Sequence, residues 1–181
     1  MKKENTLTSF LLIIIIVISI YYLKQGSILE TNYSLLSQKN YWPLLLFGIC
    51  QSSYYFIVNK EIKTNNISNY LTLIFCIFTF IIPYNENNAL LSNLHIFFGY
   101  LAFLFTNVCF IENLYYAHLI SLKPMILSSI IMYGIIAFFY LLFMHVNTLL
   151  ETIFFTSIDL IYFFSINKLK TVKNYEVNYE T

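Results

Sequence analysis

Long apolar runs leave this chain few possible folds, because most of its length is too hydrophobic for a water-soluble domain. A membrane-spanning helix needs about 20 mostly apolar residues. Six segments approach that length: residues 7–23, 41–58, 68–84, 93–111, 125–145 and 149–167. Only 10% of the 181 residues are charged, whereas soluble domains carry about 25%. The sequence therefore predicts an all-α, polytopic membrane protein, with residues 1–181 forming a single bundle of six transmembrane helices.

The first apolar run, "FLLIIIIVISIYYL", follows Met1-Lys2-Lys3 and so resembles the start of a secretory signal. A signal peptide ends in a small-x-small cleavage site, but the residues that follow this run are "KQGSILE". We therefore expect the run to be an uncleaved first span.

The lysines predict the orientation of the bundle, because cytoplasmic loops of membrane proteins carry an excess of Lys and Arg. With both termini in the cytoplasm, only Lys24 and Lys39 lie outside. The other eight lie inside: Lys2, Lys3, Lys60, Lys63, Lys123, Lys168, Lys170 and Lys173. The sequence thus predicts a multi-pass protein of the cell membrane with both termini cytoplasmic. Arg is absent while Lys, Asn and Ile are abundant, which we interpret as the bias of an AT-rich genome, and we expect a bacterial source.

Composition and motifs exclude several classes of function. The net charge is +1 without a basic tract, so the electrostatic signature of a nucleic-acid binder is missing. The three cysteines stand far apart inside apolar runs, without the spacing of a metal site or a disulfide framework. The sequence has no nucleophile elbow, phosphate-binding glycine loop or HExxH motif, so catalysis has no motif to support it. We expect no cofactor, no resident metal and no catalytic residue, and we lean toward a non-enzymatic role.

Small and polar residues mark the helix faces that pack inside a membrane bundle, because lipid-facing positions are as apolar as the core. We predict one inward face in each of three segments. In residues 93–111 and just beyond, it carries His95, Gly99, Ala102, Thr106, Cys109 and Asn113. In residues 41–58 and just beyond, it carries Gly48, Ser52, Tyr55 and Asn59, with Gln51 beside them; in residues 125–145 it carries Gly134, Ala137, Leu141 and His145. These faces serve either close packing or a ligand cavity.

Three ionisable residues lie near the predicted extracellular ends of the last three spans. Glu151 follows Thr148 in "TLLE", the pattern of a capping box at a helix start. His145 lies in a last helical turn, where the helix dipole favours a cation, and His95 lies in a first turn, where it disfavours one. Either these residues are caps and hydrogen-bonded filler, or they converge on a ligand-binding pocket at the outer face.

Asp159 is the ionisable residue without such a local explanation. It lies ten residues into the last span, about 15 Å deep and thus near the bilayer midplane. An aspartate at a helix centre costs about 2.5–3.5 kcal/mol on insertion, so we expect it to be protonated, hydrogen-bonded or exposed to a water-filled cavity. Gln51 and Ser52 lie at the same depth and are its expected partners. The group is either a polar clasp between helices or a site that handles a proton or a ligand.

The second half of the chain resembles a known group of proteins. In "FIIPYNENNALLSNLHIFFGYLAF", a proline marks the exit from the third span and Leu94-His95 opens the fourth after a short polar loop; Glu151 then opens the last span. Over residues 71–164 this arrangement is similar to the uncharacterised bacterial relatives of the DRAM/FRAG group of six-helix membrane proteins. Those relatives often carry an arginine after the glutamate, where Thr152 stands here. The resemblance implies that His95 and Glu151 match the group's recurring polar residues and that the function is related to lipids.

These patterns leave three hypotheses about function. The favoured one is binding or transport of a small or lipidic ligand through an outer-face polar pocket, with His95, His145, Glu151, Asp159 and Gln51 as ligand-binding residues. The second is an intramembrane lipid-modifying enzyme that uses His95 and Glu151. The third is a non-catalytic immunity protein or a subunit of a larger membrane complex. The expected partners are therefore the lipid bilayer, a lipid or small molecule, and another membrane protein.

Overall fold

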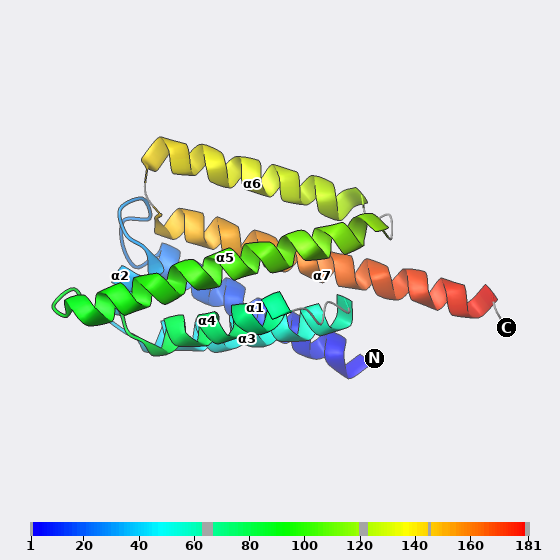
Figure 1. Ribbon diagram of the computed structural model, residues 1–181, viewed down its shortest axis with the longest axis horizontal. Coiled ribbons are helices and arrows are strands. Elements are labelled where there is room, and N and C mark those ends of the chain that lie inside the picture. The colour runs from blue at the N-terminus through cyan, green and yellow to red at the C-terminus, as the bar shows by residue number, and fades with distance from the viewer. Residues whose placement is uncertain (1, 63–66, 120–122, 145, 180–181) are drawn as a thin grey trace.

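A computed structural model describes residues 2–62, 67–119, 123–144 and 146–179 of the chain (Figure 1). All regular secondary structure in these ranges is α-helical. Six helices are long: α1 (Lys2–Leu23), α3 (Trp42–Ile62), α4 (Ile67–Ile81), α5 (Ala89–Leu119), α6 (Lys123–Phe143) and α7 (Thr148–Tyr179). A short helix, α2 (Tyr33–Ser37), lies between α1 and α3. The all-α class predicted from the sequence is confirmed.

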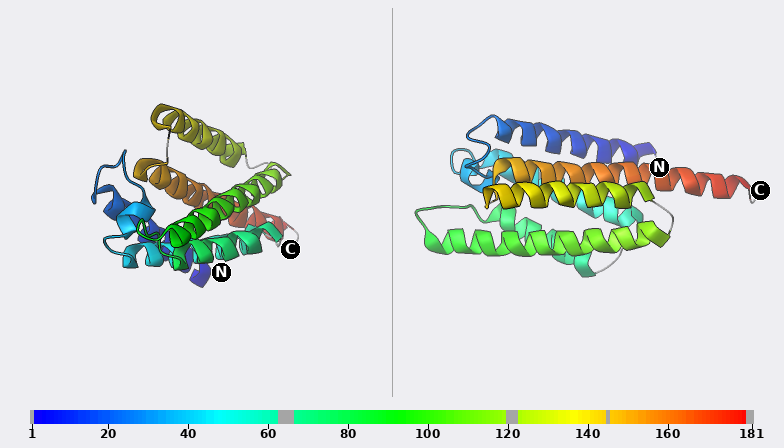
Figure 2. Two further views of the ribbon diagram at one scale, coloured as in Figure 1. Left: turned by 60° about the vertical axis from the view of Figure 1, so that its left-hand side comes forward. Right: turned by 90° about the horizontal axis from the view of Figure 1, so that it is seen from above.

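The long helices form a ring in which each helix packs against two neighbours. The contacts follow the order α1, α3, α4, α5, α6, α7 and return to α1, and α3 also contacts α7 across the ring. Consecutive long helices run in opposite directions, so both termini lie at one end of the bundle while α2 lies at the other (Figure 1, Figure 2). We name the end that carries α2 the cap end and the opposite end the termini end.

Among the described residues, three helices are long and apolar enough to cross a membrane, within Thr6–Leu23, Ala89–Asn113 and Ile126–Phe143. The outward faces of these helices are apolar too. On α1, for example, Phe10, Ile13 and Val17 are exposed while Leu12 and Ile15 are buried. A helix that is apolar on all sides lies either in a membrane or deep inside a large protein. The helices of this small bundle therefore indicate a membrane-associated protein.

The helices follow the six predicted segments in order, but their ends differ. α4 ends at Ile81 rather than 84, because Pro83 disfavours helical geometry in the residue before it. α5 begins at Ala89 rather than 93. The side chain of Asn88 accepts a hydrogen bond from the Leu91 amide at 3.2 Å and so supplies an N-cap. α7 continues to Tyr179, well past the predicted end at 167.

Two of the three predicted inward faces are confirmed. On α5 the predicted residues are buried except for Gly99, which is half-buried, and on α3 the predicted residues are all buried. The prediction for α6 is wrong, because Gly134, Ala137 and Leu141 face outward while Ser129 and Met132 are buried. A Cβ atom at Gly134 would meet no atom within 4 Å, so this glycine does not mark a close helix contact. His145, the last residue of that predicted face, lies outside the described residues.

Candidate functional site

The segment between α1 and α3 closes the cap end of the bundle by bonding to the start of α7. The Thr148 amide and hydroxyl both donate to the Thr31 carbonyl, at 2.6 and 2.8 Å, and the Leu149 amide donates to the Ile28 carbonyl at 3.2 Å. Because these bonds join residues about 117 positions apart in the chain, they fix the segment that carries α2 against the bundle.

The capping box predicted at Thr148 is wrong. The residue that caps α7 is Asn147, whose side-chain oxygen accepts from the Leu150 amide at 3.0 Å. Thr148 cannot play this part because its amide and hydroxyl are engaged by Thr31. The carboxylate of Glu151 is consequently not used within its own helix and reaches a neighbouring one.

Glu151 holds the first residue of α2. Its Oε2 atom accepts from the Tyr33 amide at 2.6 Å, directly after the N-cap residue Asn32. The Tyr33 hydroxyl makes a second link to α7, at 2.8 Å from Thr152 Oγ1. Burial raises the pKa of this hydroxyl to about 12, so it stays protonated and able to donate at neutral pH. Glu151 and Thr152 together tie α2 to α7.

His95 holds the next residue of α2. Its Nδ1 lies 2.6 Å from the Ile82 carbonyl and its Nε2 lies 2.8 Å from the Ser34 hydroxyl. A carbonyl can only accept, so Nδ1 carries the hydrogen; Nε2 of the neutral ring then accepts from the Ser34 hydroxyl. The buried imidazole thus joins α5, the end of α4 and the start of α2.

The outer-face residues predicted as a ligand pocket are therefore partly brought together. His95 and Glu151 bind adjacent residues of α2, Ser34 and Tyr33, while His145 lies outside the described residues. Asp159 lies eight residues along α7 from Glu151, about 12 Å farther into the bundle. Gln51 contacts Asp159 and not the cap. A role of these five residues in ligand binding stays a prediction.

Asp159 and Gln51 form a buried pair that links α7 to α3. Gln51 Nε2 donates to Asp159 Oδ1 at 2.8 Å, and the Tyr54 hydroxyl donates to the backbone carbonyl of Asp159 at 2.7 Å. All three residues are fully buried. Gln51 is the partner expected from its depth, whereas Ser52, the other expected partner, has a buried hydroxyl without a hydrogen-bond partner.

A second buried polar cluster, not predicted from the sequence, lies toward the termini end. The Asn113 amide group on α5 donates to Asn59 Oδ1 on α3 at 3.0 Å and to the Tyr162 hydroxyl on α7 at 2.7 Å. Asn59 and Asn113 both belong to the predicted inward faces, so their meeting could have been inferred from the spacing. Tyr162 carries no such signal, since tyrosine is abundant throughout the chain.

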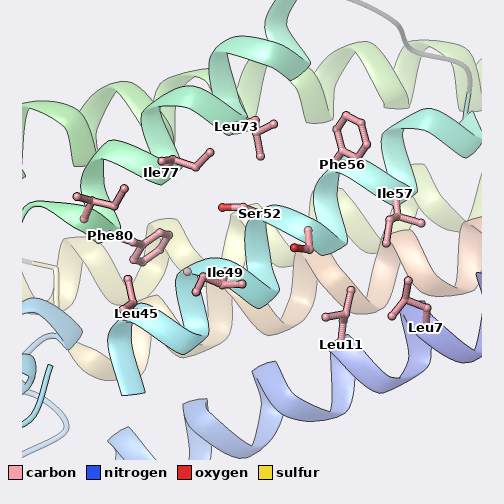
Figure 3. A pocket seen from close by; sticks show the side chains of 13 residues that line it. Leu7, Leu11, Leu45, Ile49, Ser52, Phe56, Ile57, Leu73, Ile77 and Phe80 are labelled. Atoms are coloured by element: carbon pink, nitrogen blue, oxygen red, sulfur yellow. The ribbon is translucent and has the colours of Figure 1, made fainter. Parts of the chain in front are cut away.

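A groove runs along the outside of the bundle between α1 and α4, with α3 as its floor (Figure 3). Its volume is about 700 Å³. Phe80 and Leu45 lie at one end, Leu7, Phe56 and Ile57 at the other, and Ser52 between them, as Figure 3 shows. The lining is apolar except for Ser52 and Ser53: Leu7, Leu11, Leu45, Gly48, Ile49, Ser52, Ser53, Phe56, Ile57, Leu73, Ile77, Phe80 and Ile81.

Phe80 closes the cap end of this groove by packing directly on Gly48. A Cβ atom built on Gly48 would lie 2.1 Å from Phe80 Cγ and 2.6 Å from Phe80 Cβ. The backbone of the same residue is also fixed, because the Tyr41 hydroxyl donates to the Phe80 carbonyl. The shape of the groove thus depends on one close contact that only glycine permits on α3.

No protein-family model, curated protein or solved structure matches the chain. Among the described residues, no group of three or more His, Cys, Asp or Glu side chains is placed to hold a metal ion. The described site has three parts: an apolar groove, a hydrogen-bond network at the cap, and a buried acid–amide pair.

Proposed function

We propose that the chain is an integral membrane protein that binds the acyl chain of a membrane lipid in the groove between α1, α3 and α4. The groove itself is the observation that carries this proposal. Its volume of about 700 Å³ falls within the range of roughly 300–1,000 Å³ that is typical of small-molecule sites. Its lining is apolar apart from two hydroxyls, which suits an aliphatic ligand.

In this proposal all six long helices cross the membrane, with both termini in the cytoplasm and the cap end outside. The distribution of the lysines supports the orientation. The outward side chains of α3, among them Leu46, Ile49 and Phe56, are exposed and apolar, as expected for contact with lipid. The polar residues that lower the hydropathy of α3, such as Gln51 and Asn59, are buried.

The position of the groove favours a lipid over a soluble ligand. The groove is lined by exposed apolar residues on all three helices, among them Leu7, Ile49 and Ile77, so within a bilayer it opens to the hydrocarbon. An unfilled groove would leave its lining without dispersion contacts on one side. In the hydrocarbon core of a bilayer, lipid acyl chains are the molecules that can supply these dispersion contacts.

The dimensions of the groove favour a chain over a compact molecule. Along its floor, Leu45 and Ile57 are twelve residues apart, which is about 18 Å of helix at 1.5 Å per residue. An extended alkyl chain matches a narrow site of this length. The lipid-related function implied by the sequence resemblance agrees with the proposal.

The polar pocket predicted at the outer face is the weaker candidate for a ligand site, because α2 already binds the polar atoms of His95 and Glu151.

A matched pair of substitutions on α4 tests the proposal. Ile77 lines the groove and is 42% exposed; Ile74, one turn away, is 44% exposed and lies outside the lining. We expect Ile77→Trp to fill the groove and raise the Kd for a phospholipid, obtained by titration in native mass spectrometry, at least tenfold, which corresponds to about 1.4 kcal/mol of binding. Ile74→Trp should retain lipid as the wild type does.

The two variants should have similar thermal unfolding midpoints, since both replaced side chains are partly exposed. Equal lipid retention by Ile77→Trp and Ile74→Trp would contradict lipid binding in the groove.

A further inference from the structure

The Asp159–Gln51 pair contains two polar atoms that have no partner. Asp159 Oδ1 accepts from Gln51 Nε2 at 2.8 Å, but Asp159 Oδ2 and Gln51 Oε1 are both buried without a hydrogen bond. An ionised carboxylate can only accept hydrogen bonds, and so can an amide oxygen. With Asp159 ionised, two acceptors would therefore lie in one buried pair without a hydrogen bond among the described residues; the Tyr55 hydroxyl beside Gln51 is likewise buried without one and is a neutral donor that leaves the charge of Asp159 uncompensated.

The surroundings of Asp159 offer no compensating positive charge among the described residues. Within the described ranges, its side chain bonds to Gln51 alone and no Lys or His interacts with it. The titratable side chains that interact electrostatically with Asp159, among the described residues, are tyrosines: Tyr54 and Tyr55 on α3 and Tyr162 on α7. The carboxylates of Glu112 and Glu151 are bound elsewhere, to Ser68 and Tyr33. A buried carboxylate without a positive partner is strongly disfavoured.

We propose that Asp159 and Gln51 together form a binding site for one proton in the middle of the bundle. The proton is carried on Asp159 Oδ2, and this O–H donates to Gln51 Oε1 while Gln51 Nε2 donates to Asp159 Oδ1. A single proton thus supplies both unpartnered atoms and removes the charge. A larger occupant has no room, since neither residue has any exposed surface.

The bound proton makes the docking of α3 on α7 dependent on pH. The folded bundle holds the proton more tightly than the unfolded chain does, so folding takes up a proton and its free energy becomes less favourable as the pH rises. The proton site is independent of the lipid groove, because it rests on the contact between α3 and α7 and not on the face of α3 that meets α1 and α4.

Asp159 is the only aspartate in the chain, which allows a direct test without mutation. Cell-free synthesis with aspartate labelled with ¹³C at its side-chain carboxyl gives the protein one labelled group, whose NMR shift reports its protonation state. An ordinary aspartate, with a pKa of about 3.9, is ionised at pH 7. We expect the shift of a carboxylic acid at pH 7 in lipid nanodiscs. The shift of a carboxylate at that pH would overturn the proposal.

Substitution of Asp159 supplies a second, independent test. In Asp159→Asn the side-chain amide can donate to Gln51 Oε1 and accept from Gln51 Nε2, so the variant keeps both hydrogen bonds without a titrating proton. We expect the unfolding midpoint of the wild type to fall with rising pH relative to that of Asp159→Asn. Parallel pH profiles for the two proteins would contradict a bound proton.

Discussion

Replacing Gly48 with alanine should destabilise the bundle, although alanine favours helix formation by up to about 1 kcal/mol over glycine. The new Cβ would lie 2.1 Å from Phe80 Cγ and 2.6 Å from Phe80 Cβ. A change of rotamer moves the Phe80 ring but not its Cβ, so the backbone of α4 must shift away from α3. Overpacking of this kind costs typically about 1–3 kcal/mol. We expect a net loss of stability, read as a lower unfolding midpoint in the same detergent.

Gly134 on α6 provides the control for this substitution, because a Cβ atom there meets no atom within 4 Å. Gly134→Ala should leave stability unchanged or raise it slightly. Phe80→Ala removes the clashing ring, so Gly48→Ala should cost less stability in the Phe80→Ala background than in the wild type. The difference between the two costs is the interaction energy of a double-mutant cycle. If Gly48→Ala and Gly134→Ala behave alike, α3 and α4 do not meet as described.

Replacing His95 with alanine should detach the cap from the bundle. The change leaves the partly buried Ile82 carbonyl and Ser34 hydroxyl without their partner. An unsatisfied group costs about 1–3 kcal/mol when it is fully buried and less when it is partly buried, and the loss of the buried imidazole creates a cavity as well. We expect a loss of about 2–4 kcal/mol in the free energy of unfolding. Hydrogen exchange should also become faster at the amides of Tyr33–Ser37.

The control for this effect is His95→Asn, whose amide nitrogen can still donate toward Ile82 and which should therefore lose less stability. If His95 instead contacts a bound ligand or takes part in a reaction, the results should differ. In that case His95→Ala would lose ligand binding or activity while its unfolding midpoint and the exchange of α2 stayed as in the wild type.

The fold was predictable where it depends on local hydropathy and helix spacing. The six apolar segments became the six long helices, and the inward faces of α3 and α5 followed from the spacing of residues such as Ser52 and Cys109. The contact of Asp159 with Gln51 followed from depth alone, because two polar residues at one level of a membrane bundle have few other partners.

The cap was not predictable in the same way, because its hydrogen bonds join distant parts of the chain. Glu151 bonds to Tyr33, 118 residues away, and no local pattern distinguishes that contact from a capping box in its own helix. The outward face of α6 was missed because small residues such as Gly134 mark a close helix contact only where another helix is present. The groove depends on the fit of Phe80 against Gly48, which is a property of packing and not of hydropathy.

Photo-crosslinking tests the central claim, an acyl chain in the groove, most directly. The protein is reconstituted with a phospholipid that carries a diazirine in its acyl chain, irradiated, digested and mapped by mass spectrometry. We expect the label to concentrate on the groove residues of α1, α3 and α4, such as Leu11, Ile49 and Ile77. A label spread equally over exposed apolar residues of α6, such as Ile130 and Phe138, would instead show that lipid only surrounds the bundle and would contradict the account.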